Sequence, residues 1–199
     1  MAPSDQTRRW AKTSATQQRI LDAATEVFAT RGFAAATMAD MVATSGASIG
    51  SIYHHFGGKY ELFLAMFEQM ANAVDRRIEE VMRQAGQSSP EGIDPRRTFE
   101  LHVRAYLEAM WENRRLARVL TAGDTPPGFE VARRGRMQAA FRHWMAVLEL
   151  DKSARGQLLR RVLVATMAES SLMVAACENS DDVPAITDAT LEWIDRLIE

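Results

Sequence analysis

The sequence is poor in the features that mark secreted and membrane-spanning proteins. Its one cysteine, Cys177, cannot form an internal disulfide, so a reducing, cytoplasmic compartment is expected. The polar N-terminus lacks the apolar core of a signal peptide. The longest apolar stretch, residues 162–177, contains Glu169 and is too short to span a bilayer. We therefore expect a cytoplasmic protein with no membrane partner.

Motifs that carry catalysis or bind cofactors are also missing. The sequence has no glycine-rich phosphate loop, no nucleophile elbow and no metal pair. Its four histidines have no tight ligand spacing with Cys177, and the adjacent His54 and His55 point to different sides of one helix. We therefore predict no enzyme, no cofactor and no metal site.

The net charge is small, −2, but it is unevenly distributed. Residues 1–60 carry six Lys and Arg against four Asp and Glu, whereas the remainder carries 18 against 22. A small basic segment on an acidic body permits local contact with DNA while the rest of the surface avoids phosphate.

Helical periodicity dominates the chain, and alternating strand patterns are absent. A first helix over about 15–31 has an apolar inward face, and Gly32 is placed to end it with a left-handed cap. A long helix is predicted from Lys59 to about Gln84, before a loop at 86–92. Body helices are predicted at about 95–112, 114–122, 128–149, 154–178 and 184–198. The predicted fold is all-α with about nine helices: a three-helix head, a long connecting helix and a helical body.

Two short helices joined by a tight turn are predicted between Thr37 and Phe56. Thr37 is a good N-cap residue, and Asp40 three residues later favours a helix N-terminus. The chain turns at Gly46, and Ser48 caps the next helix. Such a pair presents its second helix at a steep angle, which suits insertion into the major groove of DNA.

The second short helix has distinct faces at about 100° per residue. The face predicted to point inward consists of Ile49, Ile52 and Phe56. The outward face is small at its centre, polar at its sides and free of acidic residues, and it consists of Gly50, Ser51, Tyr53 and His54, with His55 at the rim. Small residues permit close approach to base edges, and the polar ones can bind phosphates or bases.

The segment Ile20–Leu62 resembles the N-terminal region of TetR-type (TetR/AcrR) transcriptional regulators. The matching run is ILDAATEVFATRGFAAATMADMVATSGASIGSIYHHFGGKYEL, which is far more specific than a lone helix-turn-helix pattern. The resemblance implies a DNA-binding domain at 1–60, with a short basic arm of Arg8, Arg9 and Lys12, and a ligand-binding and dimerisation domain at 61–199. One departure is Ala47, where the family favours a larger aliphatic residue.

The resemblance also implies which residues contact operator DNA: Thr37, Ser48, Ile49, Gly50, Ser51, Tyr53, His54, His55 and Lys59. Among them, Thr37, Tyr53 and Lys59 would hold phosphates, and Ile49, Gly50 and Ser51 would lie nearest the bases. The protein would then be a homodimeric repressor in the bacterial cytosol or nucleoid, released from a palindromic operator by a small, mostly apolar effector.

For the body, the resemblance implies an effector pocket and a dimer interface made by the last two long helices. The candidate pocket residues are Phe99, His102, Tyr106, Met110, Trp111, Met137, Phe141, Trp144, Met167 and Met173. The candidate interface residues are Leu159, Val162, Leu163, Thr166, Ser170, Trp193, Ile194 and Leu197. Two other functions stay open: an enzyme, which would turn over its bound molecule, and a small-molecule carrier with a vestigial head, which would not recognise a DNA sequence.

Overall fold

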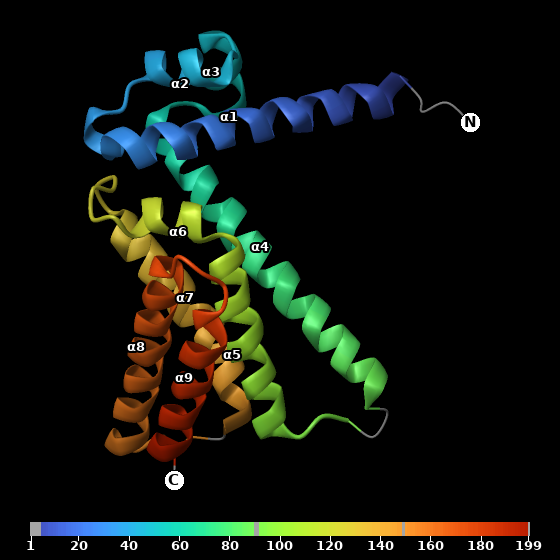
Figure 1. Ribbon diagram of the computed structural model, residues 1–199, viewed down its shortest axis with the longest axis vertical. Helices are drawn as coiled ribbons and strands as arrows, with labels where there is room; N and C mark the ends of the chain where they lie inside the picture. The colour runs from blue at the N-terminus through green and yellow to red at the C-terminus, as the bar shows by residue number, and fades with distance from the viewer. Residues whose placement is uncertain (1–4, 90–91, 149, 199) are drawn as a thin grey trace. The chain divides into compact units, whose positions relative to one another are not determined.

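The computed structural model describes residues 5–89, 92–148 and 150–198, and the side chains of 14–146, 148 and 150–198 within them. The described chain consists of helices and their connections, which confirms the all-α prediction (Figure 1). None of the helices in these ranges is long and apolar enough to cross a membrane. The chain forms two compact units. The head unit comprises Met1–Gln69 and Val119–Pro127, and the body unit comprises Met70–Arg118 and Gly128–Glu199.

The head unit contains α1 (Asp5–Ala35), α2 (Met38–Ser45), α3 (Ile49–Phe56) and the first part of α4 (Lys59–Ser88). Helix α1 begins well before the predicted start because no glycine or proline interrupts the sequence after Pro3. The predicted basic arm therefore has helical backbone. The side chains of Arg8, Arg9 and Lys12 lie outside the described residues.

Helix α1 is kinked at Gly32, which has φ 73° and ψ 171°. The predicted left-handed cap is thus found only in the positive φ of Gly32, because its ψ is extended and helical backbone resumes and continues to Ala35. The positive φ favours glycine, and a Cβ would lie 2.1 Å from Asp124 Oδ2, so that this carboxylate would have to move. The same carboxylate accepts the N–H of Ala34 at 3.1 Å. Within the head unit, the segment that follows α6 is thus tied to the end of α1.

Aromatic side chains form the centre of the head core. The rings of Phe28, Phe33 and Phe63 lie 5.3 to 5.7 Å apart, a distance typical of stacked and edge-to-face pairs. Ile20 of α1, Met41 of α2 and Ile52 of α3 are fully buried around them. The core therefore fixes α2 and α3 against α1.

The body unit continues α4 and adds α5 (Pro95–Glu112), α6 (Arg114–Thr121), α7 (Phe129–Met145), the short 3-10 helix η1 (Ala146–Leu148), α8 (Ala154–Ala176) and α9 (Asp182–Ile198). These bounds confirm the predicted body helices. Helix α4 ends at Ser88 rather than near Gln84, because Gly86 is tolerated inside it at a cost of about 1 kcal/mol. Helices α4 and α6 each pass from one unit to the other.

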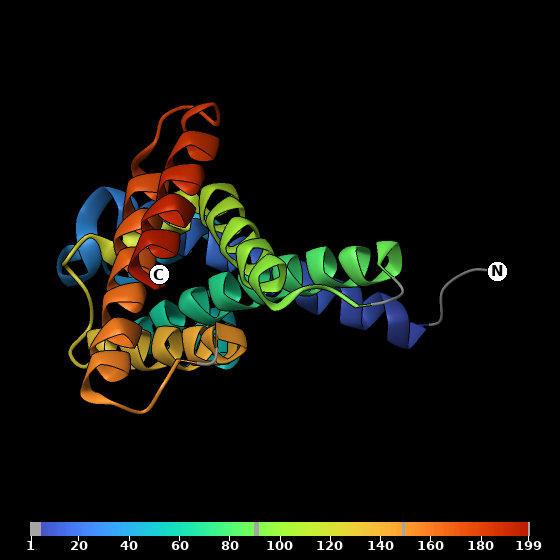
Figure 2. The same cartoon turned by 90° about the horizontal axis from the view of Figure 1, so that it is seen from below.

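Helices α8 and α9 run side by side, and α5 packs against both (Figures 1 and 2). Buried Leu163 of α8 and Ile194 of α9 belong to this core, and Ser170 Oγ lies 2.8 Å from Thr190 Oγ1. The guanidinium of Arg118 in α6 donates to the carbonyl oxygens of the last residues of α8, at 2.6 Å for Ala175. A cation there satisfies carbonyls that have no partner within the helix.

We predict that Gly32→Ala lowers the stability of the head unit by about 1–3 kcal/mol, since it combines a strained backbone with a collision. Thermal unfolding followed by circular dichroism measures the effect. Gly86→Ala is the matched control, because Gly86 is exposed in α4 with nothing near its Cβ position. That control is expected to raise stability slightly. Equal melting of the two variants would contradict the role assigned to Gly32.

Candidate nucleic-acid interface

Helix α2 begins at a complete capping box. The Thr37 hydroxyl accepts the N–H of Asp40 at 3.2 Å, and the Asp40 carboxylate accepts the N–H of Thr37 at 2.9 Å. The bonds from Thr37 hold the pKa of the Asp40 carboxyl below its ordinary value, and the nearby charge of Arg31 acts in the same direction. Both the hydroxyl and the N–H of Thr37 are therefore engaged inside the head unit.

Two local hydrogen bonds stabilise the turn between α2 and α3. Gly46 adopts the left-handed conformation with φ 64°, and its N–H donates to the carbonyl of Val42 at 2.9 Å. The Ser48 hydroxyl then accepts the N–H of Ser51 at 3.1 Å and caps α3. The predicted turn and both predicted caps are confirmed. Ser45 and Ala47, on either side of Gly46, are buried, so the turn is part of the core.

The outward face of α3 is open. Gly50 and His54 are exposed, Tyr53 has half of its surface accessible, and Ser51 and His55 lie at the edges. A Cβ at Gly50 would have no atom within 4 Å. The amides of Ile49 and Gly50 have no acceptor within the helix and carry its positive dipole end. The face can thus approach an anionic surface closely.

The prediction that Ile49 points inward is wrong, since 52% of its surface is exposed. It occupies the first position of α3, beyond the part of the helix that packs on the core. Phe56, at the other end, is only half-buried, so Ile52 is the side chain that anchors α3. An exposed isoleucine at the start of α3 adds an apolar group to the outward face.

Lys59 is directed into the head unit. Its ammonium donates to the carbonyl oxygens of Phe33 at 2.8 Å, Ala34 at 3.3 Å and Ala36 at 2.9 Å. It also lies 4.5 Å from the centre of the Phe33 ring. Three acceptors match the three donors of an ammonium group. This bonding, which links the start of α4 to the α1–α2 connection, was not anticipated from the sequence.

Comparison with known proteins shows which proteins the head unit resembles. Residues 20–66 match the model of the bacterial regulatory proteins of the tetR family. The repressor AcnR of Corynebacterium efficiens is 40% identical over 72 residues, which cover 34% of this chain and 38% of AcnR. The regulator SrpR of Pseudomonas putida is 41% identical over 56 residues, 28% of this chain and 26% of SrpR. The match thus spans well under half of these curated relatives.

The likeness in fold extends over nearly the whole chain. A TetR-like transcriptional regulator from Rhodococcus sp. RHA1 superposes with a TM-score of 0.69 at 24% identity, covering 91% of this chain and 94% of that one. The head therefore matches the tetR family over residues 20–66, and the chain as a whole shares the fold of such a regulator. The TetR family is one of regulatory proteins, which agrees with the prediction of a regulator rather than an enzyme.

The body unit gathers four of the predicted pocket residues into one aromatic cluster. Ring centroids lie 5.7 Å apart for His102–Trp144, 5.3 Å for Tyr106–Phe141 and 4.9 Å for Phe141–Trp144. Burial raises the pKa of Tyr106, whose hydroxyl bonds to Ser171, and lowers the pKa of His102. Burial thus favours the neutral form of both groups.

The other predicted pocket residues are dispersed. Met110 and Met167 are buried, and Trp111 lies under the guanidinium of Arg114 at 3.9 Å. Phe99 borders a separate pocket between α5 and α9, and Met137 borders a groove between α7 and α8. Met173 has half of its surface exposed and faces out from α8.

The predicted interface residues divide into two sets. Leu159, Val162 and Thr166 are partly exposed, and Trp193 and Leu197 are exposed. By contrast Leu163, Ser170 and Ile194 are buried inside the protomer, where they pack α8 against its neighbours. When a helix has apolar side chains on several faces, its sequence does not indicate which face packs against the other helices of the same chain.

We predict that Lys59→Met destabilises the head unit by about 1–3 kcal/mol, because partly buried carbonyl oxygens lose a charged donor. Urea unfolding of the full chain measures the loss. Lys152→Met is the control, since Lys152 is exposed in the loop before α8. If both variants unfold at the same urea concentration, the Lys59 bonds contribute nothing.

Proposed function

We propose that the protein is a transcriptional repressor that binds operator DNA as a homodimer through α3. The observation that carries this proposal is the open, acid-free face of α3 on a head that matches the tetR family model. The relative AcnR is named a repressor, which supports the direction of regulation. The proposal covers residues 1–60 as the DNA-binding domain and 61–199 as the ligand-binding and dimerisation domain.

In this proposal α3 enters the major groove. Gly50 lets the helix backbone approach the base edges, with Ile49 and Ser51 beside it. Tyr53, His54 and His55 extend to the flanking phosphates, as does the N-terminal end of α3 at Ser48. Thr37 and Lys59 act mainly by positioning, because their polar groups are already bonded within the head unit.

A dimer would be made by one face of α8 and α9, here called the apolar face: Leu159, Val162, Thr166, Met173, Trp193 and Leu197. Trp193 is 60% exposed and Met173 50%, which is a large apolar area on two adjacent helices. Two copies related by a two-fold axis would bury it in a four-helix interface. Paired heads then read two half-sites, which makes the operator an imperfect palindrome.

Effector control is proposed to act through the two helices that join the units. Helices α4 and α6 begin in one unit and end in the other, and Asp124 after α6 holds the N–H of Ala34. The aromatic cluster around Tyr106 offers an apolar lining for a small effector. An effector releases DNA only to the extent that it binds the DNA-free state more tightly.

We predict that Gly50→Glu weakens operator binding at least about 100-fold while leaving the fold intact. A carboxylate there meets phosphate or base acceptors, and like charges at an interface cost several kcal/mol. Duplexes enriched from a genomic DNA library serve as probes in fluorescence anisotropy.

The matched control for Gly50→Glu is Gly135→Glu, at an exposed glycine of α7 whose Cβ position is equally open. It adds the same charge to the body and is expected to keep affinity within about three-fold, as surface charges act weakly at a distance. Equal binding by both variants would remove α3 from the interface.

We predict that Trp193→Glu converts the dimer to a monomer without unfolding, since the side chain is exposed in the protomer. Sedimentation velocity gives the mass. Val131→Glu is the control, because Val131 is an exposed apolar residue of α7 outside the apolar face. A Trp193→Glu variant that stays dimeric would show that the copies associate elsewhere.

A further inference from the structure

A broad groove between α7 and α8 carries unbalanced positive charge. Its volume is about 940 Å³, and five arginines line it: Arg133, Arg134, Arg142, Arg160 and Arg161. No aspartate or glutamate is among its lining residues. A concave surface with charge of one sign concentrates ions of the opposite sign.

The arginines of this groove differ in how far they are already neutralised. Arg133 pairs with Glu130 at 2.7 Å, and Arg160 donates to the Leu150 carbonyl near the charge of Asp151. Arg134 of α7 and Arg161 of α8 are exposed and have no hydrogen-bond or ion-pair partner among the described residues. Two guanidinium groups on facing helices are thus available to an anion.

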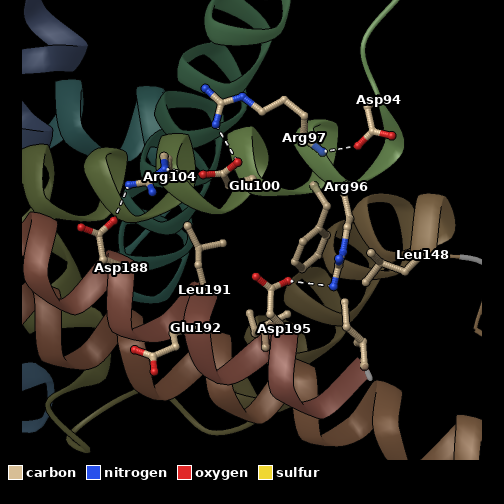
Figure 3. A pocket seen from close by; sticks show the side chains of 13 residues that line it. Asp94, Arg96, Arg97, Glu100, Arg104, Leu148, Asp188, Leu191, Glu192 and Asp195 are labelled. Atoms are coloured by element: carbon tan, nitrogen blue, oxygen red, sulfur yellow. Dashed lines mark hydrogen bonds and ion pairs between the residues drawn. The ribbon is translucent and has the colours of Figure 1, made fainter.

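The pocket between α5 and α9 provides a contrast (Figure 3). Its arginines are matched with carboxylates: Arg96 with Asp195 at 3.4 Å, Arg97 with Glu100 at 2.6 Å and Arg104 with Asp188 at 2.8 Å. Two of these pairs join α5 to α9, and the pair of Arg97 with Glu100 lies within α5. The groove between α7 and α8 has five arginines in its lining against three in this pocket, and no carboxylates.

The groove also has an apolar part. Met137 and Met145 of α7 and Val164 of α8 also line it, and Met145 is buried. Methionine adapts its shape to different guests. Polar groups at the edges with an apolar lining are typical of small-molecule sites, and the volume lies in the range of such sites.

We propose that this groove binds an organic anion in which a phosphate or carboxylate head is joined to an apolar chain. Arg134 and Arg161 hold the head, because a guanidinium group presents paired donors that match two anionic oxygens. The chain lies along the methionines and Val164. On α8 the groove faces away from the apolar face, since Val164 of the groove and Val162 of the apolar face are two steps, about 200°, apart. Binding therefore requires neither DNA nor loss of the dimer.

The test is calorimetric titration of the full-length protein with octyl phosphate below its micelle concentration. We expect saturable binding, at least ten-fold weaker in the variant Arg134→Gln/Arg161→Gln. The control Arg76→Gln/Arg155→Gln loses two exposed arginines outside the groove and is expected to bind like the unmodified protein. Octanol, which lacks the anionic head, is expected to bind at least ten-fold more weakly.

Two results overturn the proposal: no binding of octyl phosphate by the unmodified protein, or equal binding by the groove variant and its control. A groove filled by a second copy of the chain would give the first result, together with dissociation of the groove variant in sedimentation. Co-sedimentation with vesicles of phosphatidic acid and phosphatidylcholine separates a lipid headgroup from a soluble ligand, and either source of the anion agrees with the proposal. None of these measurements uses DNA, so they stand apart from the operator tests.

Discussion

One ammonium group holds together the connection on which the candidate DNA-binding surface depends. Lys59 at the start of α4 binds three carbonyl oxygens between Phe33 and Ala36, in the link from α1 to α2. From the other side, the Asp124 carboxylate binds the N–H of Ala34 and occupies the space that a side chain at residue 32 would need. The ammonium group thus binds carbonyl oxygens, and the carboxylate binds an amide, of one short segment. Because α2 follows that segment directly, its position relative to α1 is set by these bonds as well as by the aromatic core.

Arginine has three uses in the body unit, and each follows from what lies within reach of the guanidinium. Arg118 satisfies the last carbonyls of α8, where a helix has acceptors but no donors. Arg104 and Arg77 bridge helices through Asp188 and Glu108. Such exposed pairs each contribute little to stability. The arginines between α7 and α8 have few carboxylates near them, and that difference is the reason for assigning ligand binding to the groove there.

The last two helices combine a buried side with an exposed apolar side. Thr190 meets Ser170 where α8 and α9 touch, and small polar residues allow their backbones to come close. Trp193 of α9 and Met173 of α8 lie on other faces of these helices and remain exposed. The exposure of these apolar side chains on adjacent helices supports the proposal that a second copy covers them. The helices that complete the core of the protomer are therefore also those proposed to join it to its copy.

Local patterns determined most of the head and the limits of nearly every helix. Thr37, Gly46 and Ser48 act on atoms within four residues, so their roles were predictable from the sequence and are confirmed. The same locality let the helical segments of the body be placed within a few residues. The contacts of Lys59 and Arg118 were not predictable, because their partners lie more than 20 and 50 residues away.

The dependence on distant partners also explains why the candidate sites of the body could not be predicted from the sequence. Helix α8 has apolar residues on several faces, so only packing against α5 and α9 decided that Leu163 and Ser170 are buried while Met173 is exposed. Likewise, Arg133-Arg134 and Arg160-Arg161 are ordinary charged pairs in the sequence, and it is the pairing of α7 with α8 that places them around one groove. The sequence alone indicated the resemblance of the head to the TetR family, the helices, and the outward face of α3 except for Ile49. Tertiary structure decided which polar groups are already bonded and which remain available, because that depends on neighbours distant along the chain.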